Sequence, residues 1–77
     1  MGDFRPIKTK CWIKYLEHLG YSFNRVKGSH FQYTMEGKRT IPVRENDKDV
    51  PALHLRTSCK SLGINIDDVY DWIEKNC

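Results

Sequence analysis

The residues best suited to chemistry form the tripeptide Gly28-Ser29-His30, with Lys27 directly before it. Histidine exchanges a proton near neutral pH, so it can act as a base or an acid. Gly28 allows backbone conformations that other residues resist, which lets a phosphate come close to the chain. Ser29 and Lys27 can donate hydrogen bonds to phosphate oxygens. These four residues favour cleavage of RNA by its own 2′-hydroxyl, a reaction for which no metal is required.

Basic residues surround this tripeptide and are concentrated in one half of the chain. Residues 1–44 contain nine Lys or Arg against three Asp or Glu, whereas residues 45–77 contain four against seven. Such an asymmetry favours a polyanionic partner, although a solvated surface is the plainer interpretation. We expect the RNA backbone to be held by Arg25, Lys27, Lys38 and Arg39.

The hydrophobic pattern predicts the elements that must position His30. Apolar residues at helical spacing predict a helix over about 9–19, and alternation predicts strands over 21–26, 29–35 and 38–44. A second helix is expected to run to about residue 62, followed by a short third helix from residue 65. The 77 residues suffice for one domain, with its core over about 8–73. The predicted fold is therefore α+β: a three-stranded antiparallel sheet between helices, in the order α-β-β-β-α, with a short C-terminal helix.

Local signals define the ends of these elements. Thr9, Asp49 and Asn65 are candidate N-caps, because their side chains can accept a hydrogen bond from a free helix N–H. Gly20 and Gly63 are placed to end the first two helices. Residues 1–8 read as a lead-in to the first helix.

Alternation within the strands predicts which side chains face the core. Phe31 and Tyr33 share one face, so His30 lies on the other, polar face. Glu36-Gly37 predicts a tight hairpin turn. Pro42 cannot donate a hydrogen bond to a neighbouring strand, so the third strand is expected at an edge of the sheet.

The cysteines and the N-terminal residues indicate a compartment. Cys11, Cys59 and Cys77 have no close spacing, match no common zinc pattern, and are expected to be free thiols in a reducing cytoplasm. Cys59 falls on the core stripe of the second helix. No apolar run suggests a signal peptide or a membrane span. We predict no metal and no cofactor.

Several segments together resemble the HicA toxins, a family of small proteins that cleave messenger RNA. The resemblance extends from about Lys8 to Trp72. The segments that carry it are Leu19-Gly20-Tyr21, Arg25-Val26-Lys27-Gly28-Ser29-His30, Phe31-Gln32-Tyr33, Thr40-Ile41-Pro42-Val43, Lys48-Asp49-Val50-Pro51 and Gly63-Ile64. It implies a fold like the double-stranded-RNA-binding domain, a catalytic His30 in a loop shaped by Gly28 and Ser29, metal-independent cleavage of mRNA, and a HicB-type antitoxin as partner.

Three positions depart from the family pattern. Many members carry a second histidine after the third strand, where this chain has Arg44-Glu45-Asn46-Asp47. Leu53-His54 replaces a small Gly-Thr pair, and the loop before the second helix is acidic. His30 is therefore expected to work with a lysine or with water as its proton partner. Two other functions remain open: a non-catalytic RNA-binding module on the same fold, and an interaction protein whose basic hairpin docks an acidic partner.

Overall fold

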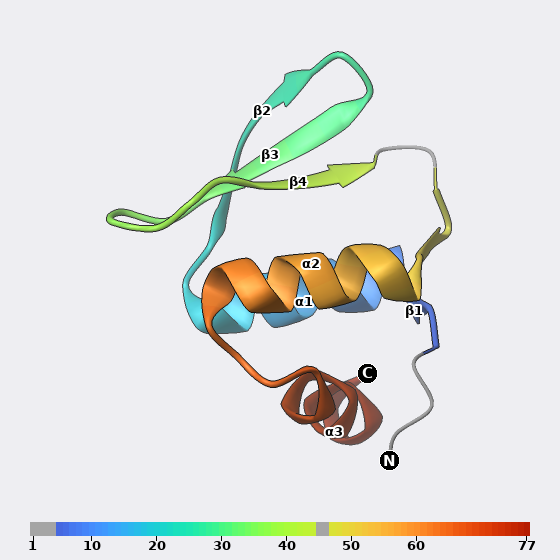
Figure 1. The fold of residues 1–77 in the computed structure, drawn as a ribbon. Coiled ribbons are helices and arrows are strands. Elements are labelled where there is room, and N and C mark those ends of the chain that lie inside the picture. The colour runs from blue at the N-terminus through green and yellow to red at the C-terminus, as the bar shows by residue number, and fades with distance from the viewer. Residues whose placement is uncertain (1–4, 45–46) are drawn as a thin grey trace.

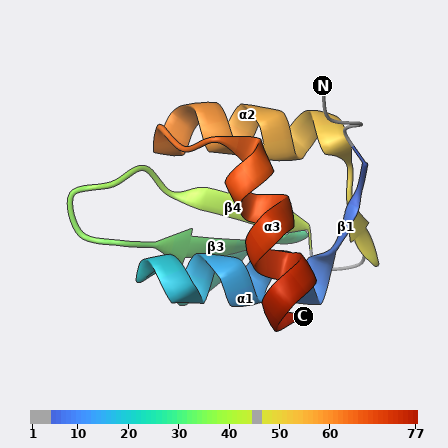
Figure 2. The same cartoon turned by 90° about the horizontal axis from the view of Figure 1, so that it is seen from below.

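The computed structural model describes residues 5–44 and 47–77; residues 1–4, and Glu45 and Asn46 of the predicted polar loop, lie outside the described residues. The chain folds into three layers (Figure 1). A sheet of three antiparallel strands covers α1 and α2, and α3 crosses the far side of both helices (Figure 2). The elements are β1 (Ile7–Lys8), α1 (Thr9–Leu19), β2 (Ser22–Lys27), β3 (His30–Thr34), β4 (Ile41–Arg44), β5 (Asp49–Val50), α2 (Ala52–Leu62) and α3 (Ile66–Asn76). The predicted α+β class is confirmed, and the arrangement agrees with that of a double-stranded-RNA-binding domain.

Helix α1 follows the predicted amphipathic pattern. Its buried residues are Cys11, Trp12, Tyr15 and Leu16, which lie on one face at helical spacing. Gly20 ends the helix with φ of +109°, a left-handed conformation that favours glycine.

The predicted N-cap of α1 is wrong. Lys8 occupies the cap position and Thr9 is the first helical residue. The Thr9 hydroxyl donates instead to the carbonyl oxygen of Asp47 at 2.7 Å, and its N–H donates to the carbonyl oxygen of Lys48 at 2.7 Å. Because the loop before α2 supplies these acceptors, the Thr9 side chain ties that loop to the start of α1.

The sheet has the order β2-β3-β4, so the strand that contains Pro42 is an edge, as predicted. Tyr33 pairs with Ile41, and Phe31 with Val43; Tyr33, Ile41 and Val43 are buried. The turn before Lys38 is confirmed by a hydrogen bond from its N–H to the carbonyl oxygen of Met35 at 3.0 Å. The third strand, however, begins only at Ile41.

Strand β2 is less regular than its sequence suggests. Tyr21 is buried, but Phe23 is half exposed. A register shift against β3 falls between Phe23 and Arg25 and interrupts the alternation. The ring of Phe23 instead packs edge-on against the rings of Phe31 and Tyr33.

A second, two-stranded sheet was not predicted. Ile7 pairs with Val50, and Lys8 with Asp49. The last two residues of the predicted lead-in thus form strand β1, and Asp49 belongs to β5 rather than capping α2. Pro51 occupies the N-cap position of α2 without a side-chain cap bond. This small sheet holds the start of α2 beside the start of α1.

The two C-terminal helices pack through α3. Gly63 ends α2, and the Asn65 side chain accepts a hydrogen bond from the N–H of Asp67 at 2.9 Å, which confirms both predicted ends. Helix α3 has 11 residues and is not short: Val69 is fully buried, and Trp72 and Ile73 pack against the core. No helix among the described residues is long and apolar enough to cross a membrane.

Two cysteines form a bond that was not expected. Cys11 of α1 is joined to Cys77, directly after α3, by a disulfide. The prediction that all three thiols are free is therefore wrong, because the α1–α3 packing brings together residues at opposite ends of the chain. Cys59 is free and buried in the core, as its position on the helical stripe predicts.

Candidate functional site

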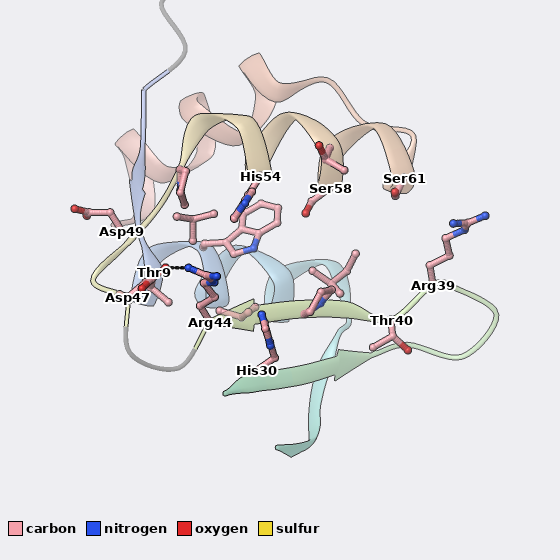
Figure 3. A pocket seen from close by; sticks show the side chains of 17 residues that line it. Thr9, His30, Arg39, Thr40, Arg44, Asp47, Asp49, His54, Ser58 and Ser61 are labelled. Atoms are coloured by element: carbon pink, nitrogen blue, oxygen red, sulfur yellow. Dashed lines mark hydrogen bonds and ion pairs between the residues drawn. The ribbon is translucent and has the colours of Figure 1, made fainter. Parts of the chain in front are cut away.

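A pocket of about 320 Å³ opens between β4 and α2, with His30 at its border (Figure 3). This volume lies at the lower end of the range that small-molecule sites occupy. Both helices that face the sheet and three strands, β3, β4 and β5, contribute residues to the pocket. Its lining residues are Thr9, Trp12, His30, Arg39, Thr40, Ile41, Pro42, Val43, Arg44, Asp47, Asp49, Val50, Pro51, His54, Thr57, Ser58 and Ser61.

His30 owes its position to the turn before it and to the register of the sheet. Gly28 adopts φ of +63° in the two-residue turn between β2 and β3. His30 then opens the central strand, paired with Lys27 on one side and with Arg44 on the other. Since directly paired residues share a face of the sheet, these three side chains form a basic row across its end.

Two arginines border the pocket near the two ends of β4. Arg39 precedes the strand, and Arg44 ends it. Arg44 forms an ion pair with Asp47, whose carboxylate oxygen lies 3.5 Å from its guanidinium. Both side chains are solvated, so the pair contributes little to folding and leaves Arg44 able to exchange Asp47 for a phosphate.

Helix α2 provides the wall opposite the sheet. His54, Ser58 and Ser61 are spaced four and three residues apart, so they lie on one face of the helix. Leu55 and Cys59 are each one position further along and anchor the adjacent face in the core. Figure 3 shows the His54 side chain extending from α2 and the His30 ring extending from β3 toward the same hollow.

The predicted site residues lie at three places relative to the pocket. His30 and Arg39 line the pocket, while Gly28, Ser29 and Lys27 form or precede the adjoining turn. Arg25 lies further along exposed β2, and Lys38 lies in the connection between β3 and β4. Neither of these two residues lines the pocket.

Sequence reasoning missed two of the pocket residues that matter most. Arg44 and His54 were noted only as departures from a family pattern, with no role assigned. The signal available for His54 was its spacing from Ser58 and Ser61 on the solvent side of the Leu55 stripe. That spacing predicts a polar face on α2, but it does not predict which other element of the fold this face lies opposite.

The buried ionisable groups lie away from this pocket chemistry. Burial raises the pKa of the Cys59 thiol to about 11 and also raises the pKa of Tyr15, Tyr21 and Tyr33. Each is therefore neutral at physiological pH and serves packing. Within residues 5–44 and 47–77, no three His, Cys, Asp or Glu side chains gather as metal ligands would.

The pocket thus combines two imidazoles, two guanidiniums, two carboxylates and several hydroxyls around a space that a phosphodiester could enter. Imidazoles transfer protons, and guanidiniums bind phosphate oxygens through paired N–H groups. The arrangement suits proton transfer at a phosphodiester better than it suits a small apolar ligand.

Comparison with known proteins identifies the family. Residues 12–64 match the family model described as the HicA toxin of bacterial toxin–antitoxin systems. This range extends from α1 through the end of α2 and includes both pocket histidines. No curated protein and no solved structure matches the chain significantly. Because the family model covers more than half of the chain, this protein belongs to the HicA toxin family of bacterial toxin–antitoxin systems.

Proposed function

We propose that this toxin is an endoribonuclease that cleaves mRNA without a metal ion, with His30 as a general acid or base. The observation that carries the proposal is the position of His30 on a pocket that Arg39 and Arg44 also line. A proton-transfer group beside two phosphate-binding cations is the minimum that cleavage by the RNA 2′-hydroxyl requires.

The chain's own residues divide the work. His30 transfers a proton at the reacting phosphodiester. Arg44, which pairs with His30 across the sheet, binds the non-bridging oxygens and stabilises the charge that develops on them, and Arg39, near the other end of β4, binds the RNA backbone further along. The turn formed by Gly28 and Ser29 admits the backbone of the RNA, because a glycine carries no side chain to exclude it. The products are a 2′,3′-cyclic phosphate and a 5′-hydroxyl.

The same proposal includes the partners and the compartment. The basic row at Lys27, His30 and Arg44 attracts a polyanion, and messenger RNA is the substrate of the toxins that the chain resembles. A HicB-type antitoxin would restrain the toxin by covering this surface. Both partners meet the toxin in the cytoplasm.

The proposal is tested by incubating the protein with end-labelled RNA in the presence of EDTA. We expect cleavage by the wild type and a loss of about 10²- to 10⁴-fold in His30→Ala, because a positioned acid or base contributes that much. His18→Ala is the matched control, since His18 lies on α1 against the ring of Trp72, outside the pocket. Equal cleavage by wild type and His30→Ala would remove His30 from the mechanism.

A second function is favoured by one observation. Arg25, Lys27 and Lys38 lie outside the pocket lining, on exposed parts of the hairpins, where they can bind phosphates without any chemistry. The alternative is a non-catalytic RNA-binding module. It predicts binding to duplex RNA that weakens steeply with salt, with intact RNA recovered afterwards.

A further inference from the structure

His54 and His30 border the same pocket from different layers of the fold. His30 comes from the central strand, and His54 comes from the first turn of α2 (Figure 3). Strand β4 lies between them, and Arg44, which pairs with His30 across the sheet, ends it at the pocket border. A phosphodiester held by Arg44 beside His30 would therefore have one imidazole on each side.

The position of His54 is fixed by the core beneath it. Leu55, the next residue, is fully buried, and Cys59 is buried one turn later. Pro51 begins the helix, and β5 holds that end against β1. Helix α2 therefore cannot rotate His54 away from the pocket without exposing Leu55 to water.

The other polar groups of the pocket are poor candidates for a second proton transfer. Arginine stays protonated, and the hydroxyls of Thr9, Thr57, Ser58 and Ser61 do not exchange protons readily near neutral pH. The carboxylates of Asp47 and Asp49 have the same sign of charge as a phosphodiester, so they repel the group that would have to exchange a proton with them. The titratable or charged groups that line the pocket are thus His30, Arg39, Arg44, Asp47, Asp49 and His54.

We propose that His54 is the second catalytic residue of this toxin and works as the proton-transfer partner of His30 across the bound phosphodiester. This inference rests on the proposed ribonuclease function and replaces the lysine or water expected from the sequence. It assigns a role to a residue at a position where the family pattern has no histidine.

The step balances with two imidazoles and no other reactant. One neutral imidazole accepts the proton of the 2′-hydroxyl as the 2′-oxygen forms its bond to phosphorus. The bond from phosphorus to the 5′-oxygen breaks, and the other imidazole, protonated beforehand, gives its proton to that oxygen. The electron pair of the broken bond stays on the 5′-oxygen. The two histidines end with their protonation states exchanged, and water restores them.

The experiment compares wild type, His54→Gln and the control His18→Gln in single-turnover cleavage of one RNA between pH 5 and 9. Glutamine keeps the hydrogen-bonding capacity of His54 but cannot transfer a proton. We expect a bell-shaped rate profile for wild type and for His18→Gln. His54→Gln should lose about 10²- to 10⁴-fold of the rate and one limb of the bell.

A second substrate identifies the end of the reaction at which His54 acts. In this RNA, sulfur replaces the 5′-bridging oxygen at the cleaved bond, so the leaving group needs no proton. If His54 is the acid, this substrate restores the rate of His54→Gln to within about tenfold of wild type. If His54 is the base, the rate stays low while the limb of the bell is lost. Either result supports the proposal.

Other outcomes overturn it. The proposal fails if His54→Gln cleaves at the wild-type rate. It also fails if His54→Gln cleaves more slowly but retains both limbs of the bell, because His54 would then be a binding residue at most. If the wild type cleaves RNA and His30→Ala does not, either of these two outcomes for His54→Gln rejects the role of His54 but not the ribonuclease function. If the wild type cleaves no RNA, the ribonuclease function and this inference fail together. Circular dichroism melting of each variant confirms that the protein assayed is folded.

Discussion

The two sides of the α1–α2 layer are built from different interactions. On the sheet side, the pocket between β4 and α2 is lined by histidines, arginines and hydroxyls, and the ion pair at its rim is solvated. On the α3 side, Trp72 packs edge-on against Tyr15 and stacks near His18. On this side a disulfide from Cys11 to Cys77 joins α1 to the residue directly after α3.

More contacts extend the tight packing from the middle of α3 to its C-terminal end. The Tyr70 hydroxyl donates to the carbonyl oxygen of Arg5 at 2.6 Å and accepts from its N–H at 2.8 Å. The Lys14 ammonium group donates to the carbonyl oxygen of Asn76 at 2.7 Å. The comparison teaches that the α3 side stabilises the molecule, so that the sheet side can place histidines and arginines at a solvent-accessible pocket where a ligand can reach them.

The largest expected effect comes from a core substitution in the α1–α2 layer, which packs against both the sheet and α3. Leu55 is 0% exposed on α2, and its truncation to alanine leaves a cavity beneath His54. We expect Leu55→Ala to lower the free energy of unfolding by about 3–5 kcal/mol, measured by urea denaturation. For a chain of this size such a loss leaves little folded protein.

The neighbouring leucine supplies the matched control. Leu53 is 68% exposed on the same helix, so Leu53→Ala should change the free energy of unfolding by no more than about 0.5 kcal/mol. Similar losses in the two variants would mean that α2 is not anchored through Leu55. The fixed position proposed for His54 would then lose its support.

The features that were predictable from the sequence are those coded over a few residues. The helix ends at Gly20 and Gly63 and the cap at Asn65 depend on local backbone conformation. The alternation in β3 and the edge position of Pro42 follow from strand geometry. His30 was selected as a candidate because its residue type and the turn before it are informative on their own.

The features that were missed depend on contacts between distant segments. The β1–β5 pair has two residues in each strand, too few for any periodicity to appear. The disulfide joins cysteines 66 positions apart, which no spacing rule predicts. His54 reaches the pocket only because α2 packs beneath β4, and Arg44 reaches it through the register with His30. Local pattern thus pointed to His30 on one side of the pocket, whereas the residues of the opposite wall could be found only from the fold.

The second prediction tests the covalent part of the α3 side. Cys77→Ser removes the disulfide and with it the constraint on a long loop of the unfolded chain. We expect a loss of about 2–4 kcal/mol in the free energy of unfolding in non-reducing buffer. The helix end at Cys77 should persist, because its N–H donates to the carbonyl oxygen of Ile73 at 2.8 Å.

Reduction of the wild type provides the control for this variant. Dithiothreitol should lower the wild-type stability to that of Cys77→Ser and leave the variant unchanged. Ribonuclease activity of the folded fraction should be the same with and without the bond, because the disulfide lies outside the pocket. A variant as stable as the oxidised wild type would show that noncovalent packing alone accounts for the α3 side.

The smallest expected effect concerns the pH dependence of the core between the two sides. The Cys59 thiol has a pKa of about 11 in the folded protein because burial disfavours the thiolate, against 9.0 as its ordinary value. Between these values the unfolded state releases the proton and the folded state keeps it. Stability is therefore full below about pH 9 and falls as the pH rises toward 11, by roughly 2 kcal/mol for this one group.

Cys59→Ala separates this contribution from that of the tyrosines. The pKa values of Tyr15, Tyr21 and Tyr33 are also raised by burial, so their loss of stability with rising pH has the same sign. Urea denaturation at pH 8, 9.5 and 11 should show a shallower decline in Cys59→Ala than in the wild type. Thiolate absorbance at 240 nm gives the folded titration directly, with Cys59→Ala as the blank. If the thiol ionised near pH 9 in the folded protein, Cys59 would be in contact with water. The core beneath helix α2 at His54 would then be accessible to solvent rather than buried.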